Sequence, residues 1–286
     1  MRQRAISSIG IVLVGLVPAI IGGPLFAIVF TIIAMLAYHE VIALFRVEPG
    51  LVNLSGYVLI GLAGLFAYLQ PDGDLFPIAV ALAVFVPIVI AVLDPQEEYG
   101  ILTAWGQVTV STLYLGTAAF AAVALREHEG VASMDWFDTI GSGLTFTDRD
   151  TAVGLGWLLL AILVTWLSDT VAYLVGRSIG RTPLIPRVSP KKTVEGAVGG
   201  IIAAGITALV CILVFGIDVH PILGLVIGIL LSVIGILGDL SESLLKRQAG
   251  VKDSGTLIPG HGGVLDRIDA LVFVIITTWL IVPFIG

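Results

Sequence analysis

The residues best suited to chemistry in this chain lie in one polar stretch, residues 238–269, of a protein in which only 12% of residues are charged. Read as a helix, its first part carries four side chains on one face, at spacings of i, i+3, i+4 and i+7: Asp239, Glu242, Ser243 and Lys246. This face directly follows the apolar run Pro221–Leu237, which places it at the end of a membrane helix. Carboxylates are costly there unless they hold a cation or a proton. The stretch therefore predicts a metal–phosphate site, and the alternative is a solvated helix with ordinary ion pairs.

A glycine-rich loop follows this helix and adds charges of both signs. Its polar residues are Lys252, Asp253, His261, Asp266, Arg267 and Asp269. Gly262 and Gly263 stand next to the histidine, and glycines allow a backbone to approach phosphate groups closely. His261 could donate a hydrogen bond or a proton, and a loop-ordering role is equally open. For Ser243, a ligand role and a helix-packing role both remain open.

A second basic loop follows the apolar segment that contains Asp169. Its sequence Ser189-Pro-Lys191-Lys192-Thr193 precedes a predicted helix and supplies backbone N–H groups, hydroxyls and two ammonium groups. This combination suits a polyphosphate. The alternative is an electrostatic anchor for anionic lipid headgroups, and we weigh the two readings evenly for three further residues: Arg177, Arg181 and Arg187.

The composition indicates a membrane protein. Hydrophobic residues make up 57% of the 286 residues and the mean hydropathy is +1.07, which excludes a soluble domain. The net charge of −7 gives no reason to expect nucleic-acid binding. Cys211 is the only cysteine, so no intramolecular disulfide can form.

Apolar stretches predict an all-α polytopic membrane protein with about nine transmembrane helices, a cytoplasmic N-terminus and a C-terminus on the opposite side. We place them at 5–22, 25–45, 54–69, 75–93, 101–125, 153–177, 194–216, 221–246 and 266–285. This arrangement puts every basic residue except Arg126 and Arg149 on the cytoplasmic side. We divide the chain into residues 1–150, with about five helices and an acidic external connection at 126–150, and residues 151–286, with about four helices and the catalytic loops. Glu40, at the cytoplasmic end of the second helix, is expected to pair with Arg46, and a role in the site is the alternative.

Two blocks of this sequence resemble a known family. The residues Ser243-x-x-Lys246-Arg247, Lys252-Asp253 and Pro259-x-His261-Gly262-Gly263-x-x-Asp266-Arg267-x-Asp269 resemble the signature of phosphatidate cytidylyltransferases, or CDP-diacylglycerol synthases. The block Ser189-x-Lys191-Lys192-Thr193-x-Glu195-Gly196 is similar to another part of the family pattern. The resemblance implies transfer of a cytidylyl group from CTP to phosphatidic acid, with release of pyrophosphate.

The predicted roles follow from this reaction between two polyanions, which needs charge neutralisation. We expect Mg²⁺ as the cofactor, bound by Asp239 and Asp266, with Asp169 and Asp269 as second-tier ligands and a second metal ion left open. The residues expected in catalysis are Asp239, Asp266, Lys192, Lys246 and Arg267. Substrate binding is expected at Ser189, Lys191, Lys192, Thr193, Ser243, Arg247, Lys252, His261, Gly262 and Gly263. No nucleophilic side chain is required, because the lipid phosphate can attack the α-phosphorus directly.

The expected partners are CTP, phosphatidic acid and membrane lipids, without nucleic acid, and a homodimer is considered. The expected location is the inner (plasma) membrane, with the site facing the cytoplasm. One alternative is a related CTP-dependent enzyme, either a CDP-archaeol synthase or a lipid-alcohol kinase. Another is a cation transporter that uses Asp169, Asp239 and Asp266 as a path. The gathering of charge at one membrane face favours the enzyme.

Overall fold

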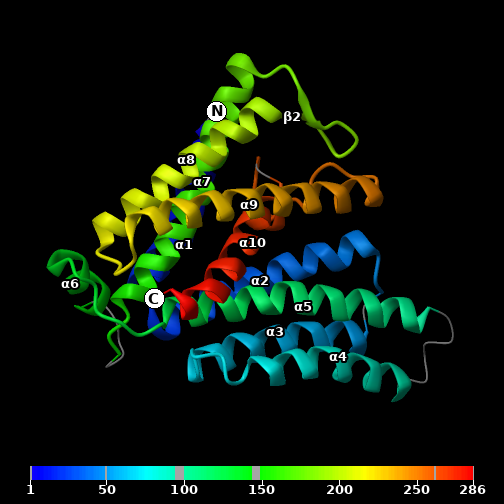
Figure 1. Cartoon of the computed structure of the whole chain (residues 1–286). Coiled ribbons are helices and arrows are strands. Elements are labelled where there is room, and N and C mark those ends of the chain that lie inside the picture. The colour runs from blue at the N-terminus through cyan, green and yellow to red at the C-terminus, as the bar shows by residue number, and fades with distance from the viewer. Residues whose placement is uncertain (1, 49, 94–99, 144–148, 261, 286) are drawn as a thin grey trace. The chain divides into compact units, whose positions relative to one another are not determined.

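The computed structural model describes residues 2–48, 50–93, 100–143, 149–260 and 262–285, which fold into two compact units (Figure 1). The first unit comprises Met1–Glu127 and Asp253–Asp266, and the second comprises His128–Lys252 and Arg267–Gly286. The chain therefore returns to the first unit for one short loop before it continues in the second. The division at residue 150 that the sequence suggested stays a prediction.

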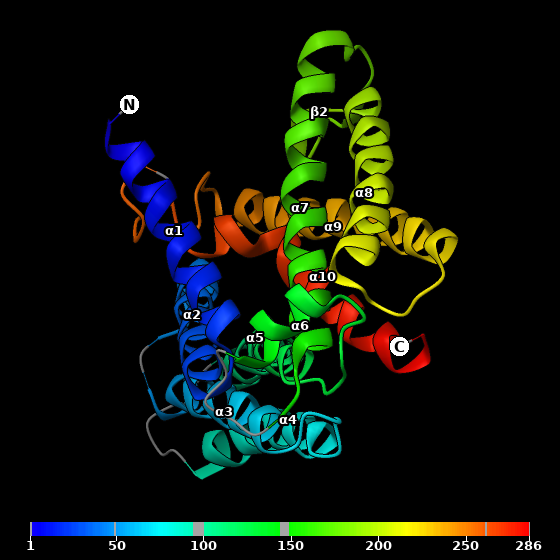
Figure 2. The same ribbon diagram turned by 90° about the vertical axis from the view of Figure 1, so that its left-hand side faces the viewer.

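Within the described residues, the first unit is a bundle of five helices. They are α1 (Arg2–Ile21), α2 (Gly23–Phe45), α3 (Leu51–Leu69), α4 (Phe76–Leu93) and α5 (Ile101–Arg126). Helices α3, α4 and α5 lie side by side, and α2 packs against α3 and α5 (Figures 1 and 2). The α1–α2 turn is held by the end of α5, since the buried Arg126 donates from Nε to Ala19 O at 2.6 Å, while Glu127 accepts from Gly23 N at 2.8 Å.

The second unit combines long helices with a small hairpin. Its elements are α6 (Asp135–Gly143), α7 (Ala152–Ile179), β1 (Pro183–Ile185), β2 (Ser189–Thr193), α8 (Val194–Phe215), α9 (Pro221–Ala249), most of α10 (Leu265–Ile281) and the 3₁₀ turn Val282–Phe284. Helices α8 and α9 both end at left-handed glycines, Gly216 and Gly250, which terminate a helix without a Cβ penalty. The antiparallel β1–β2 pair sets Pro183 opposite Thr193 and Ile185 opposite Ser189. Neither this hairpin nor α6 was predicted from the sequence.

Helix α8 packs closely on α7 and α9 through small residues at four-residue spacing. These are Gly196, Gly200, Ala204 and Ala208, all buried. A Cβ at Gly200 would lie 2.9 Å from Ser168 O of α7, so the α7 backbone occupies the space of a side chain. On the opposite face, Val198 and Ile202 are more than half exposed, as expected of side chains that contact lipid. Figure 2 shows α7 and α8 side by side.

The expectation of an all-α integral membrane protein is confirmed in its main features. The described residues contain ten α-helices, of which eight are long and apolar enough to cross a membrane. Helix α1, expected as a further span, contributes the shorter apolar segment Val12–Ile21 to the described part of the chain. The count of nine and the orientation of the termini stay predictions. With 29 residues, α9 extends for about 43 Å, which exceeds a hydrocarbon core of about 30 Å and leaves a polar end outside it.

We predict that Gly200→Leu lowers the free energy of unfolding by about 1–3 kcal/mol, because the new side chain must push α7 away from α8. Thermal unfolding in detergent micelles measures this change. The control is Val198→Leu, which adds bulk on the exposed face of the same helix and should change stability by less than about 0.5 kcal/mol. Equal effects of both variants would contradict the close α7–α8 packing.

Candidate active site

A cavity of about 440 Å³ lies in the second unit among α7, the hairpin, α8 and α9. Five of its lining residues are predicted site residues: Asp169, Lys191, Lys192, Thr193 and Asp239. Arg177 and Tyr173 also line it, and the two side chains are joined by a 3.3 Å hydrogen bond from the guanidinium to the phenol oxygen. The cavity thus brings two acids and three cations together in one space that is large enough for a triphosphate group.

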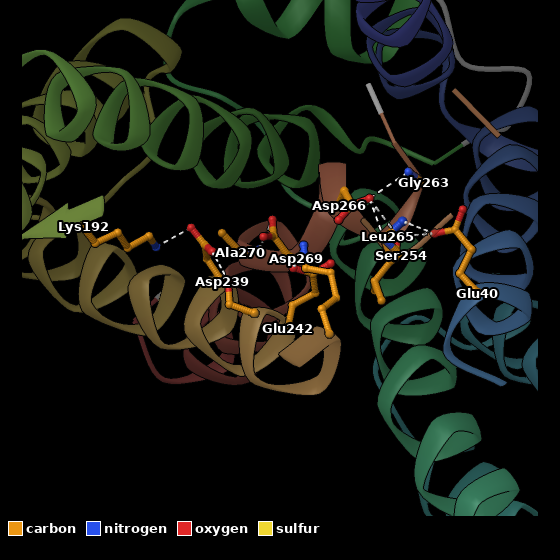
Figure 3. A network of polar contacts seen from close by, with 12 residues as sticks. Glu40, Lys192, Asp239, Glu242, Ser254, Gly263, Leu265, Asp266, Asp269 and Ala270 are labelled. Atoms are coloured by element: carbon orange, nitrogen blue, oxygen red, sulfur yellow. Dashed lines mark hydrogen bonds and ion pairs between the residues drawn. The ribbon is translucent and has the colours of Figure 1, made fainter. Parts of the chain in front are cut away.

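Asp239 is the central acid of this cavity. Its carboxylate forms an ion pair with the ammonium group of Lys192, which links α9 to β2 (Figure 3). Ser243, one turn further along α9, donates from Oγ to Asp239 Oδ1 at 3.4 Å. Both side chains of the ion pair are about one-quarter exposed, so the pair remains accessible from the cavity. Asp239 and Lys192, which were predicted for the same catalytic site, thus lie in direct contact.

Further acids surround Asp239. Asp169 on α7 and Asp269 on α10 lie within electrostatic range of Asp239 and of each other. Glu242, which is 2% exposed, forms an ion pair with Lys246 one turn along α9. Asp169, Asp239 and Asp269 are therefore close enough to repel one another in a partly desolvated site. A cation placed among these carboxylates would relieve that repulsion.

The donor set fits Mg²⁺ better than a metal enclosed by protein. Within the described ranges, no three carboxylate, imidazole or thiolate groups converge closely enough to hold an ion by themselves. Mg²⁺ commonly takes one or two protein carboxylates and completes its shell with phosphate oxygens and water. Asp239 and Asp169, which line the same cavity, match this requirement.

The basic block is held in place by the hairpin and by the start of α8. Lys191 and Lys192 lie in strand β2, whereas the sequence analysis expected them in a loop. Glu195, in the first turn of α8, accepts hydrogen bonds from Arg181 N at 3.1 Å and from Thr182 Oγ1 at 3.0 Å. Thr193 caps α8 by accepting from Gly196 N at 3.2 Å. These bonds fix the strand that presents both lysines to the cavity.

A separate polar cluster lies in the first unit around Asp266. A single oxygen, Oδ2, accepts from Ser254 N at 2.9 Å, Ser254 Oγ at 3.0 Å and Gly263 N at 2.8 Å (Figure 3). Gly262 has a φ of +83°, and a Cβ there would lie 2.5 Å from the same oxygen. In this unit, Asp266 therefore orders the glycine-rich loop, and its predicted metal-ligand role stays a prediction.

For Glu40, the sequence analysis favoured the wrong partner. The expected pair with Arg46 is wrong, since the Glu40 carboxylate turns to the loop and Arg46 is the left-handed C-cap of α2. Glu40 is 3% exposed and accepts from Val264 N, Leu265 N and Ser254 Oγ, each at 2.8 Å. The available signal was an acid inside an apolar helix, whose burial requires partners. Those partners are more than 200 residues away in the chain, so no local motif reveals them.

The remaining predicted residues occupy the ends of the long helices and the loop. Arg247 is exposed in the last turn of α9, Lys252 is exposed in the segment after it, and Arg267 is exposed in the first turn of α10. Ser189 begins β2. His261 lies outside the described residues.

Comparison with known proteins gives a consistent result. Residues 2–285 match the model of a family described as the cytidylyltransferase family. The chain is 31% identical over 282 residues to a phosphatidate cytidylyltransferase of Bacillus subtilis (strain 168), covering 96% of this chain and 94% of that protein. It is 48% identical over 136 residues to a phosphatidate cytidylyltransferase of Staphylococcus saprophyticus, and 45% identical over 136 residues to one of Staphylococcus haemolyticus. Each staphylococcal match covers 48% of this chain and 52% of the relative, so this chain spans about half the length of those proteins.

We predict that Lys246→Met lowers the free energy of unfolding by about 3 kcal/mol, because it removes the ammonium group that is paired with the buried Glu242 carboxylate. The measurement is unfolding of the substrate-free protein in detergent micelles. Arg247→Met is the matched control: this neighbouring cation is exposed, and its loss should change stability by less than about 0.5 kcal/mol. If the two variants are equally stable, the Glu242–Lys246 pair does not support the fold.

Proposed function

We propose, on the premise that this chain belongs to the phosphatidate cytidylyltransferase family, that the cavity of its second unit is the active site. The enzyme transfers the cytidylyl group of CTP to phosphatidic acid and forms CDP-diacylglycerol and pyrophosphate. The observation that carries the assignment of the site is the ion pair between Lys192 and Asp239 in a cavity that also contains Asp169. It places Lys192, from one family-like block, in direct contact with Asp239, which lies one helical turn before Ser243 of the other block.

The basic residues of the cavity bind the triphosphate of CTP. Lys191 and Lys192 neutralise phosphate charge, and the hydroxyl of Thr193 is a further hydrogen-bonding group on the same wall. A phosphate oxygen of phosphatidic acid attacks the α-phosphorus of CTP, a new P–O bond forms, and the bond from the α-phosphorus to the oxygen that bridges to the β-phosphorus breaks. The electrons of the broken bond leave with pyrophosphate. No covalent enzyme intermediate is needed.

Acidic side chains of this chain would hold a magnesium ion. Asp239 is the principal ligand, and Asp169 and Asp269 lie within its electrostatic range. Asp266 remains a proposed ligand on the basis of its place in the family-like sequence. A Mg²⁺ ion held by these carboxylates would supply positive charge that offsets the charge developing on the leaving pyrophosphate.

The other predicted residues complete the proposal. Phosphate binding, shared between CTP and lipid, is assigned to the following residues: Lys246, Arg247, Lys252, Arg267, Ser189, Ser243, His261, Gly262 and Gly263. The distribution of basic residues supports a cytoplasmic N-terminus, an external C-terminus and a site that faces the cytoplasm of the inner membrane. Soluble CTP and membrane-bound phosphatidic acid can both reach such a site. Nucleic acid is no partner in this proposal, and assembly as a homodimer stays open.

The decisive experiment incubates the purified protein in detergent–lipid micelles with phosphatidic acid and Mg²⁺. CTP labelled at the α-phosphate should transfer its label to lipid, and CTP labelled at the γ-phosphate should release it as pyrophosphate. Label from the γ-phosphate in lipid would instead identify a kinase. Ion flux through proteoliposomes without nucleotide would support the transporter alternative.

We predict that Asp239→Ala and Asp266→Ala each lower turnover by at least about 100-fold, because each removes a carboxylate that is proposed to bind the metal ion. The protein should remain folded and membrane-inserted, as measured by its elution from a size-exclusion column in detergent.

Excess chelator should also stop the wild-type reaction, and added Mg²⁺ should restore it. Full turnover in chelator would contradict the metal mechanism, and full turnover in either purified variant would remove that residue from the ligand set.

A further inference from the structure

The carboxylate of Glu40 is buried in the first unit, and the proposed reaction assigns no task to it. It projects from α2 to the loop Asp253–Asp266, where it accepts hydrogen bonds from Ser254 Oγ, Val264 N and Leu265 N (Figure 3). One oxygen serves Val264, and the other serves both Leu265 and Ser254. The Glu40 carboxylate thus accepts three hydrogen bonds from a loop that is more than 200 residues away in the sequence.

The loop is fitted closely around this carboxylate. A Cβ at Gly263 would overlap both Glu40 Oε2 and Ser254 Oγ, and a Cβ at Gly255 would lie 2.6 Å from Glu40 Oε1. Two glycines therefore make the approach of Glu40 possible. The family-like glycine Gly263 has an evident packing partner in Glu40, in addition to its proposed role in substrate binding.

Glu40 also occupies the beginning of α10. This helix starts at Leu265, and the first N–H groups of a helix have no partner within it. The negative charge of Glu40 satisfies the N–H of Leu265 and is favoured by the positive end of the helix dipole. Hydroxyl Oγ of Ser254 connects Glu40 to Asp266, because it lies within hydrogen-bonding distance of both carboxylates. A hydroxyl has one proton, so it donates to one of them at a time.

We propose that Glu40 is a positioning residue for cytidylyl transfer: through Ser254 and the N–H groups of Val264 and Leu265, it fixes the loop that carries Gly262, Gly263 and Asp266. This inference rests on the proposed function, in which those loop residues act on the substrates. Glu40 itself contacts neither substrate. Its charge sets the conformation in which the loop is ready before CTP binds.

The test compares Glu40→Gln with Glu127→Gln in the full-length protein. Both replacements are isosteric, both wild-type residues are at most 3% exposed in the first unit, and both carboxylates accept an N–H at the start of a helix. In Glu40→Gln, an amide NH₂ replaces one of the two acceptor oxygens. It then faces an N–H or O–H donor, so at least one hydrogen bond to the loop is lost. We expect kcat per folded molecule to fall by about 10- to 100-fold, because misplaced loop residues no longer meet the reacting groups. Glu127→Gln should keep kcat within about twofold of the wild type. Its thermal stability should fall about as much as that of Glu40→Gln.

A second readout reports the loop directly. Hydrogen exchange of the amides of Val264 and Leu265 should be faster in Glu40→Gln and unchanged in Glu127→Gln. Should Glu40→Gln fail to fold, Ser254→Ala removes the hydroxyl bridge alone and should lower kcat in the same direction, with faster exchange at the same amides.

The outcomes separate this inference from the proposed function. A wild-type protein that forms no CDP-diacylglycerol overturns the proposed function. If the wild type is active, wild-type kcat in folded Glu40→Gln, or in Ser254→Ala where the first variant does not fold, overturns the positioning role alone. An equal loss of kcat in Glu127→Gln would show that any buried carboxylate in this unit has the same effect, and would also overturn it.

Discussion

A carboxylate that leaves water must meet a cation or hydrogen-bond donors, and this requirement governs both polar clusters of the protein. The first unit satisfies it with neutral donors: Glu40 and Asp266 are surrounded by backbone N–H groups and a serine hydroxyl. The second unit satisfies it with lysines: Lys192 pairs with Asp239, and Lys246 pairs with Glu242. The acids of the first unit order the loop, whereas Asp169, Asp239 and Asp269 of the second unit repel one another and would be stabilised by a further cation.

Hydropathy predicted most of the membrane helices. Eight of the expected spans correspond to long apolar helices, because the apolar runs are separated by residues that end a helix, such as Gly22 or Gly216. The pairing of an α9 acid with the Lys191–Lys192 block was within reach of the same reasoning. Asp239 and the two lysines each stand at the end of an apolar run. Polar side chains at such positions are expected near the membrane surface, where the ends of several membrane helices lie close together.

Other features depend on contacts that no local pattern encodes. The β1–β2 hairpin contains prolines and lysines without the alternation of a strand, so the segment read as a loop. Glu40 was assigned to its neighbour Arg46, because local reasoning favours partners that are close in sequence, and its true donors follow α9. For the same reason, the sequence did not predict that the loop Asp253–Asp266 belongs to the first unit: the composition does not change at either end of the loop.

The fixed position of Thr193 at the end of β2 bears on the affinity for the proposed nucleotide. Thr193 caps α8, and the glycines Gly176 and Gly180 at the end of α7 leave room for its side chain, so the strand bearing Lys191 and Lys192 is clamped between two helices before any nucleotide arrives. The conformational entropy of ordering that strand is therefore lost during folding and not during association. Binding of the proposed nucleotide to such a preorganised strand would lose less entropy than binding to a flexible basic loop of equal charge, so more of the electrostatic attraction would remain as binding free energy.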